Sequence, residues 1–105
     1  MKNVYLIVYD NYNSITKEFK EQDQIFGATV FDTWNLARYA MLKISKLYDK
    51  EQIFEFDFDD KNQLFSLKVH VMYGYDLHFR VCKLIFQKDL EELGLDENEK
   101  PNTTI

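Results

Sequence analysis

The stretch Ile25–Tyr48, which reads IFGATVFDTWNLARYAMLKISKLY, decides the fold that the sequence predicts. Its first seven residues form an apolar run typical of a β-strand, and residues 33–48 follow with the periodicity of an amphipathic helix. Thr33, or Asp32 before it, is suited to the N-cap because a short side-chain oxygen accepts hydrogen bonds from the free first-turn N–H groups. The apolar stripe of this helix consists of Trp34, Ala37, Met41, Ile44 and Tyr48.

The residues before this stretch predict strands. Val4–Tyr9 is a continuous apolar run, which is typical of a central strand that is buried on both faces. Ile15–Lys20 alternates weakly and is able to pair back on the first strand. Gly27 marks the place for a bulge, and residues 15–31 fit either one bulged strand or two short ones.

Three runs after the helix predict a three-stranded antiparallel meander over residues 53–86. Apolar and polar residues alternate in each run, as in strands with one buried face. Keeping the apolar faces together predicts Phe56 opposite Phe65 and Phe54 opposite Leu67, with a loop of residues 59–62. The same rule predicts a three-residue loop in the second hairpin, either 73–75 or 74–76.

These elements predict an α+β fold in which one long helix, residues 33–48, covers an antiparallel sheet. The N-terminal strand or strands, the helix and the meander follow one another along the chain. A short acidic helix over Lys88–Leu93 completes a single domain of residues 1–94, and residues 95–105 form a flexible acidic tail.

Composition limits the classes of function. The chain has 105 residues, 46% hydrophobic, and a formal net charge of −5. This charge argues against direct nucleic-acid binding, which needs an excess of Lys and Arg. The lone Cys82 and the absence of a signal-like or membrane-spanning run predict a cytoplasmic protein without contact to a membrane.

Catalytic and metal-binding motifs are weak. Asp57, Asp59 and Asp60 begin like a calcium loop, but Lys61 and Asn62 stand where a ligand and the invariant glycine belong. His70, His78 and Cys82 share one predicted sheet face and offer the residue types of a thiolate enzyme, but no activating helix N-terminus is expected beside Cys82. We therefore expect no metal, no cofactor and no catalysis, with a small enzyme using the His70/His78/Cys82 face as an alternative.

Two features favour binding of another protein. Acidic residues gather in Glu51–Asp60 and again in Asp89–Glu99, which suits a partner with a basic surface. Several tyrosines fall at turns and strand ends, and tyrosine is enriched at protein interfaces. The predicted partner-binding residues are Glu55, Asp57, Asp59, Asp60, Tyr73 and Tyr75.

The residues Val4–Val8, Ile25–Gly27, Val30–Thr33 and Ala37 resemble a pattern found in small phage and mobile-element proteins of Gram-positive bacteria. The resemblance covers about the first 45 residues, and Ala28 and Thr29 depart from it. It implies an accessory protein that inhibits host defence enzymes, including CRISPR nucleases, by occupying a basic groove or an assembly surface. It assigns no functional residue.

Residues 33 onward also resemble a double-stranded RNA-binding domain, but Lys88–Glu92 is acidic where that family needs basic residues. The leading hypothesis is thus an acidic, non-catalytic protein-binding module that inhibits a host nucleic-acid enzyme. A self-associating regulatory domain, and hence a homodimer, is the second hypothesis, because a free edge strand invites pairing between chains.

Overall fold

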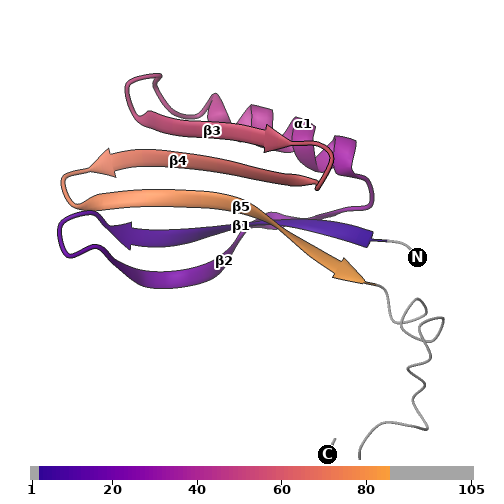
Figure 1. Cartoon of the computed structure of the whole chain (residues 1–105), viewed down its shortest axis with the longest axis horizontal. Helices are drawn as coiled ribbons and strands as arrows, with labels where there is room; N and C mark the ends of the chain where they lie inside the picture. Colours follow the sequence, from indigo (N-terminus) through magenta and orange to yellow (C-terminus); the bar gives the residue numbers. More distant parts are fainter. Residues whose placement is uncertain (1–2, 86–105) are drawn as a thin grey trace, which may run out of the picture.

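The computed structural model describes residues 3–85, which fold into one antiparallel sheet and one helix. The strands lie in the order β2-β1-β5-β4-β3, and α1 lies behind the sheet in Figure 1. The elements are β1 (Asn3–Asn13), β2 (Glu18–Phe31), α1 (Trp34–Ser45), β3 (Ile53–Asp59), β4 (Leu64–Met72) and β5 (Tyr75–Ile85). The α+β class is as expected.

The first strand is central, as its apolar sequence predicts. β1 pairs with β2 on one side and with β5 on the other, so Val4 and Val8 are buried on one face and Tyr5 and Ile7 on the other. Residues 15–31 provide one bulged strand rather than two short ones. Gly27 has a φ of 75° within the bulge, where a residue without Cβ meets no steric penalty.

The helix is shorter than predicted. Thr33 is its N-cap, and the Thr33 Oγ1 atom accepts a hydrogen bond from the Leu36 amide at 3.2 Å. The helix ends at Ser45, because the next amides bond to carbonyls only three residues back, Lys46 to Lys43 at 3.1 Å and Leu47 to Ile44 at 3.0 Å. Such tightened turns end α-helices, so Tyr48 lies beyond this one.

The core lies between α1 and one face of the sheet, which we call the covered face. Trp34, Ala37 and Met41 are buried there against the strands, as the apolar stripe predicts. The Trp34 ring meets Tyr5 edge-on with centroids 6.1 Å apart and stacks on Phe65 at 6.0 Å. The strands contribute to the core Tyr5, Ile7, Phe65, Leu67, Val69, Phe79 and Val81.

The meander forms as predicted, but both predicted registers are wrong. In the first hairpin Phe56 lies opposite Leu67 and Phe58 lies opposite Phe65, a shift of two residues that keeps the apolar faces together. In the second hairpin β4 and β5 are joined by the two residues 73–74, and a register shift between His70 and Met72 keeps the faces matched. The bulge was not visible in the sequence, so a three-residue loop was predicted instead.

The predicted helix Lys88–Leu93, the tail 95–105 and the domain boundary at 94 lie outside the described residues. Within residues 3–85, no helix is long and apolar enough to cross a membrane.

Candidate functional site

The face of the sheet opposite α1 is not covered by any other element of residues 3–85, and we call it the open face. At the end formed by the start of β1 and the end of β5 it carries an apolar patch. Val30, Leu6 and Cys82 stand in one cross-strand row of this patch. Its outer members are well exposed, with Ile25 at 57%, Val30 at 54% and Leu84 at 42%.

A charged network follows the apolar patch. Asp10 is buried, with a relative exposure of 5%, and its carboxylate accepts hydrogen bonds from Arg80 Nε at 3.0 Å and Arg80 Nη2 at 3.3 Å. The Asp23 amide donates to the same carboxylate at 2.8 Å, and the Asp23 side chain also bonds Arg80. A buried carboxylate needs such partners, so Arg80 and the turned backbone at Asp23 together stabilise the charge of Asp10.

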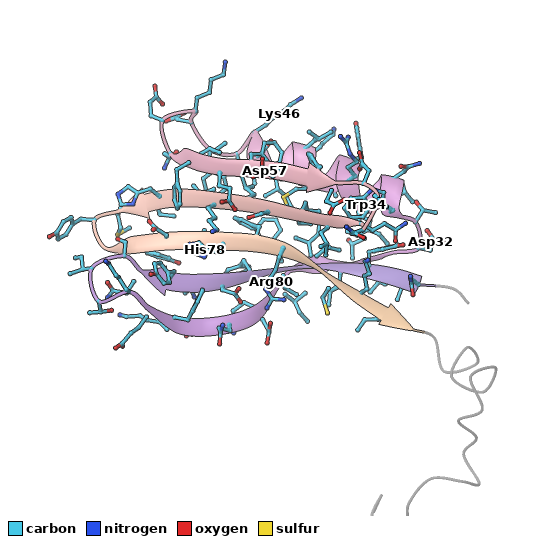
Figure 2. The ribbon with its side chains drawn as sticks, in the orientation of Figure 1. Asp32, Trp34, Lys46, Asp57, His78 and Arg80 are labelled. Atoms are coloured by element: carbon cyan, nitrogen blue, oxygen red, sulfur yellow. The ribbon has the colours of Figure 1, made fainter. Side chains whose placement is uncertain are left out.

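An aromatic cluster surrounds His78 on the open face, beside Arg80 on β5 (Figure 2). The imidazole ring stacks on Tyr12 at 4.9 Å and meets Phe19 edge-on at 5.6 Å and Phe54 edge-on at 6.4 Å. Burial by these rings, and then the charge of Lys68, lower the pKa of His78. This ring is therefore held mainly in its neutral form near neutral pH.

Glu55 and Asp76 also make polar contacts on the open face. Glu55 accepts a hydrogen bond from the Ser66 hydroxyl and lies 3.5 Å from Lys68 Nζ. The hydrogen bond from Ser66, and then Lys68, lower the pKa of Glu55 against the opposing effect of burial. Asp76 is buried and lies 2.7 Å from His70 Nδ1.

The structure disperses the predicted acidic site residues. Glu55 and Asp57 stand on β3, with Glu55 paired to Ser66 and Lys68. The Asp59 carboxylate accepts from the Asn62 side chain at 2.8 Å and from the Asn62 amide at 3.1 Å, bonds that lower the pKa of Asp59 and hold the turn.

Asp60 has a structural role on the helix side of the molecule. Its Oδ1 atom accepts from Trp34 Nε1 at 2.9 Å and from Arg38 Nε at 3.0 Å, so it ties the β3–β4 turn to α1. Replacing Asp57, Asp59 and Asp60 together would thus disturb the fold as well as the surface charge.

Tyr73 and Tyr75 lie at the other end of the sheet from these acidic residues, on either side of Gly74. The Tyr73 side chain is 88% exposed, whereas the Tyr75 hydroxyl donates to Asn11 Oδ1 at 3.0 Å. The six predicted residues therefore do not form one surface.

Cys82 stands far along the sheet from both histidines of the His70/His78/Cys82 face. His70 is bound to Asp76 on β5. Cys82 lies six residues further along the same strand, about 20 Å away at the ~3.3 Å rise of a strand residue. His78 and Cys82 are four residues apart, about 13 Å by the same rise. Within residues 3–85, no three His, Cys, Asp or Glu side chains gather in a way that could hold a metal ion.

Sequence reasoning missed the centre of the open face. No motif in the sequence singles out Asp10 or Arg80, yet both belong to the charged network. The sequence predicts strand structure at Phe19 and Val30 but does not predict which face of the sheet they occupy. Their position depends on the bulges of β2, and Gly27 is the residue in the sequence that indicates a bulge there.

Comparison of the chain with protein-family models, with curated proteins and with solved structures finds no match.

Proposed function

We propose that this protein is a non-catalytic protein-binding module whose docking surface is the open face of the sheet. The observation that carries the proposal is the apolar patch on a sheet face that no element of residues 3–85 covers. Contiguous exposed apolar surface beside aromatic residues and arginine is typical of protein interfaces.

The charge distribution supports contact through apolar and aromatic side chains. Arg80 is paired with Asp10 and Asp23, and Lys68 is paired with Glu55, so this face needs few counter-charges from a partner. Residues 3–85 contain 12 acidic and 10 basic residues and are close to neutral. Residues 3–85 alone are therefore a poor imitation of a nucleic acid.

The acidic excess lies in residues 86–105, which contain six of the 18 acidic residues and two of the 13 basic ones. This segment continues from Ile85, next to Leu84 of the apolar patch. A partner that fits both features has an apolar contact surface beside a basic one, as a nucleic-acid enzyme has at the edge of its binding groove. Inhibition of such an enzyme is the activity that we propose.

The test begins with capture of the partner from a host or phage-infected lysate, followed by affinity measurements with the purified complex. Val30→Glu should weaken binding at least about tenfold, or about 1.4 kcal/mol, because it places a charge in the apolar patch. Leu36→Glu is the matched control, since Leu36 on α1 is 51% exposed and Val30 is 54% exposed. The control should bind within about twofold of the wild type.

A third variant separates the apolar from the charged contribution. Replacing Asp89, Glu91 and Glu92 by their amides should slow association and flatten its dependence on salt, with little change in dissociation. Unaltered binding by a folded Val30→Glu variant would overturn the docking surface. An unaltered salt dependence in the amide variant would contradict a partner with a basic surface, but it would not contradict the open face as the docking surface.

Self-association is the alternative to this proposal, and the β2 edge of the sheet disfavours it. β2 and β3 are the outer strands of the sheet, and their outer edges carry no neighbouring strand among residues 3–85. Asp23, with a φ of 60°, and Gly27 interrupt the edge of β2, and such bulges hinder pairing between chains. Sedimentation at micromolar concentration should show a monomer, whereas a dimer that Val30→Glu dissociates would place a second copy on the open face.

A further inference from the structure

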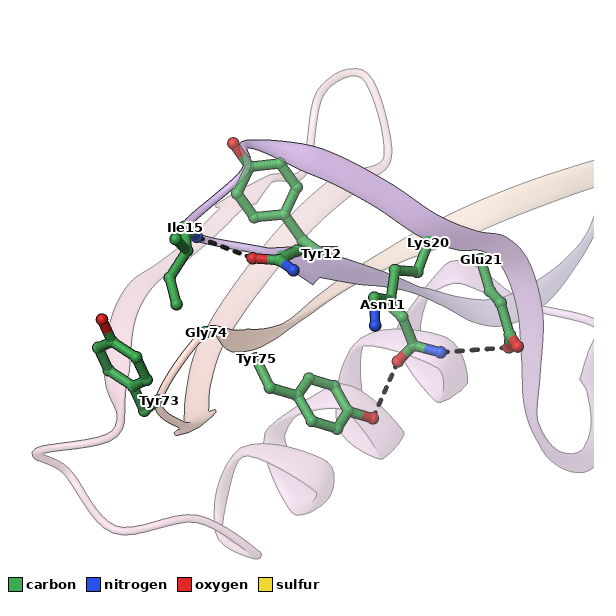
Figure 3. Close-up of a pocket in the computed structure, with 9 residues that line it drawn as sticks. Asn11, Tyr12, Ile15, Lys20, Glu21, Tyr73, Gly74 and Tyr75 are labelled. Atoms are coloured by element: carbon green, nitrogen blue, oxygen red, sulfur yellow. Dashed lines mark hydrogen bonds between the residues drawn. The ribbon is translucent and has the colours of Figure 1, made fainter.

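A cavity of about 390 Å³ lies where the β1–β2 and β4–β5 turns meet, at the opposite end of the sheet from the apolar patch (Figure 3). Its volume falls within the range of small-ligand sites, about 300–1,000 Å³. The side chains that give it chemical character are those of Asn11, Lys20, Glu21, Tyr73 and Tyr75.

Two side-chain hydrogen bonds in this cavity form a chain that ends at Glu21. A carboxylate only accepts, so Asn11 must present its amide nitrogen to Glu21, and the Nδ2–Oε2 distance is 3.3 Å. Asn11 Oδ1 in turn accepts from the Tyr75 hydroxyl at 3.0 Å. This direction uses the hydroxyl hydrogen of Tyr75 and leaves its oxygen, together with the second oxygen of Glu21, as acceptors for a ligand.

The aromatic part of the cavity lining, like these acceptor oxygens, favours a cationic ligand. The rings of Tyr73 and Tyr75 belong to the cavity lining, whereas the Tyr12 ring is stacked on His78 on the open face. The face of an aromatic ring attracts a cation. Acceptor oxygens, one carboxylate and aromatic faces together suit a planar cation that donates several hydrogen bonds. A guanidinium group has this chemistry.

The walls of the cavity are fixed by the contact between the two turns. The Asn13 side chain accepts from the amides of Ile15 at 2.9 Å and Thr16 at 3.1 Å, which orders the first turn. Gly74 has a φ of 77°, and a Cβ atom there would lie 2.8 Å from Ile15 Cδ1, so the second turn packs closely against the first. A ligand thus meets a preformed site, which lowers the cost of binding.

We propose that this cavity binds the guanidinium group of an arginine side chain presented by a peptide or protein. Glu21 and the Tyr75 oxygen accept its hydrogen bonds, and the tyrosine rings contact its faces. Lys20, which also lines the cavity, opposes a cation and would favour an anion. The effect of replacing Lys20 on binding therefore distinguishes a cationic ligand from an anionic one. The proposal does not depend on docking at the open face.

The experiment is an amide NMR titration of the full-length chain with Nα-acetyl-L-arginine amide, and the control probe is the citrulline equivalent, which has the same shape without the charge. The arginine probe should shift the amides around Asn11, Glu21 and Tyr75 with millimolar affinity, and the citrulline probe should bind at least about fivefold more weakly. Glu21→Gln should weaken arginine binding about fivefold, and Lys20→Gln should strengthen it about twofold.

Three results would overturn the proposal. They are equal binding of the two probes, weaker arginine binding in Lys20→Gln, and no shift at these amides with about 50 mM arginine probe. Tyr73→Ala serves as a second variant should Glu21→Gln fail to fold, because the exposed Tyr73 side chain makes no hydrogen bond that the fold needs among residues 3–85. It should weaken arginine binding more than citrulline binding, and an equal effect on both probes would also contradict a cation site.

Discussion

The covered and the open face of the sheet are built from alternate residues of the same strands, yet different interactions stabilise their buried side chains. On β5, Phe79 points to the covered face, is 1% exposed and contacts the rings of Tyr9, Phe26 and Tyr48. The next residue, Arg80, points to the open face and keeps part of its side chain in solvent while it binds buried Asp10. The covered face depends on filled volume, and the open face on paired charge.

This difference teaches that the open face is stable without a covering element. Asp10 and Asp76 are buried there, and within residues 3–85 no buried side-chain nitrogen or oxygen lacks a hydrogen-bond partner. The apolar patch is the part of this face that hydrogen bonds and ion pairs do not stabilise. Burial by a partner would therefore stabilise this part of the face most.

The largest effect is expected on the covered face. Phe79→Ala should lower the free energy of unfolding by about 3–5 kcal/mol, because it leaves a cavity among packed rings. Urea unfolding measures this loss. Phe54→Ala is the matched control on the open face, where Phe54 is 56% exposed, and it should cost about 1 kcal/mol or less. Similar losses at both positions would mean that the two faces are not distinct.

A smaller effect is expected from breaking the charged network of the open face. Arg80→Met keeps the length of the side chain but leaves buried Asp10 without its cation, which should cost about 1–3 kcal/mol. Lys68→Met is the control, because its pair with Glu55 is partly exposed and should contribute about 1 kcal/mol or less. A loss for Arg80→Met no greater than that for Lys68→Met would show that pairing does not stabilise Asp10.

The covered face was predictable from the sequence because its signals are local. The apolar stripe of α1 and the alternation in β4 and β5 specify inward residues such as Met41, Leu67 and Phe79 directly. A register shift of two leaves these faces unchanged, which is why the faces could be predicted although Phe56 was paired with the wrong residue.

The open face was not predictable to the same extent, because it depends on contacts between distant residues. Asp10 and Arg80 are 70 positions apart and meet only after β1 pairs with β5. The contact of Asp23 with Asp10 and Arg80 also requires a positive φ at Asp23, and an aspartate in the sequence does not predict that backbone conformation. The dispersal of the acidic residues has the same cause, since neighbours in sequence such as Asp57 and Asp60 serve opposite sides of the molecule.

The smallest effect sharpens the comparison through pH. Because burial among aromatic rings lowers the pKa of His78 in the folded protein, the unfolded chain binds more protons between that lowered pKa and the ordinary value near 6.5. Stability should therefore fall as pH decreases through about 6.5 and level off below the folded pKa. His78→Gln should flatten this part of the profile, measured by urea unfolding from pH 7.5 to about 5.

His70→Gln is the control on the same face, and it should retain the slope that His78 contributes. An unchanged slope in His78→Gln would mean that the aromatic cluster accommodates the charged imidazole as well as water does.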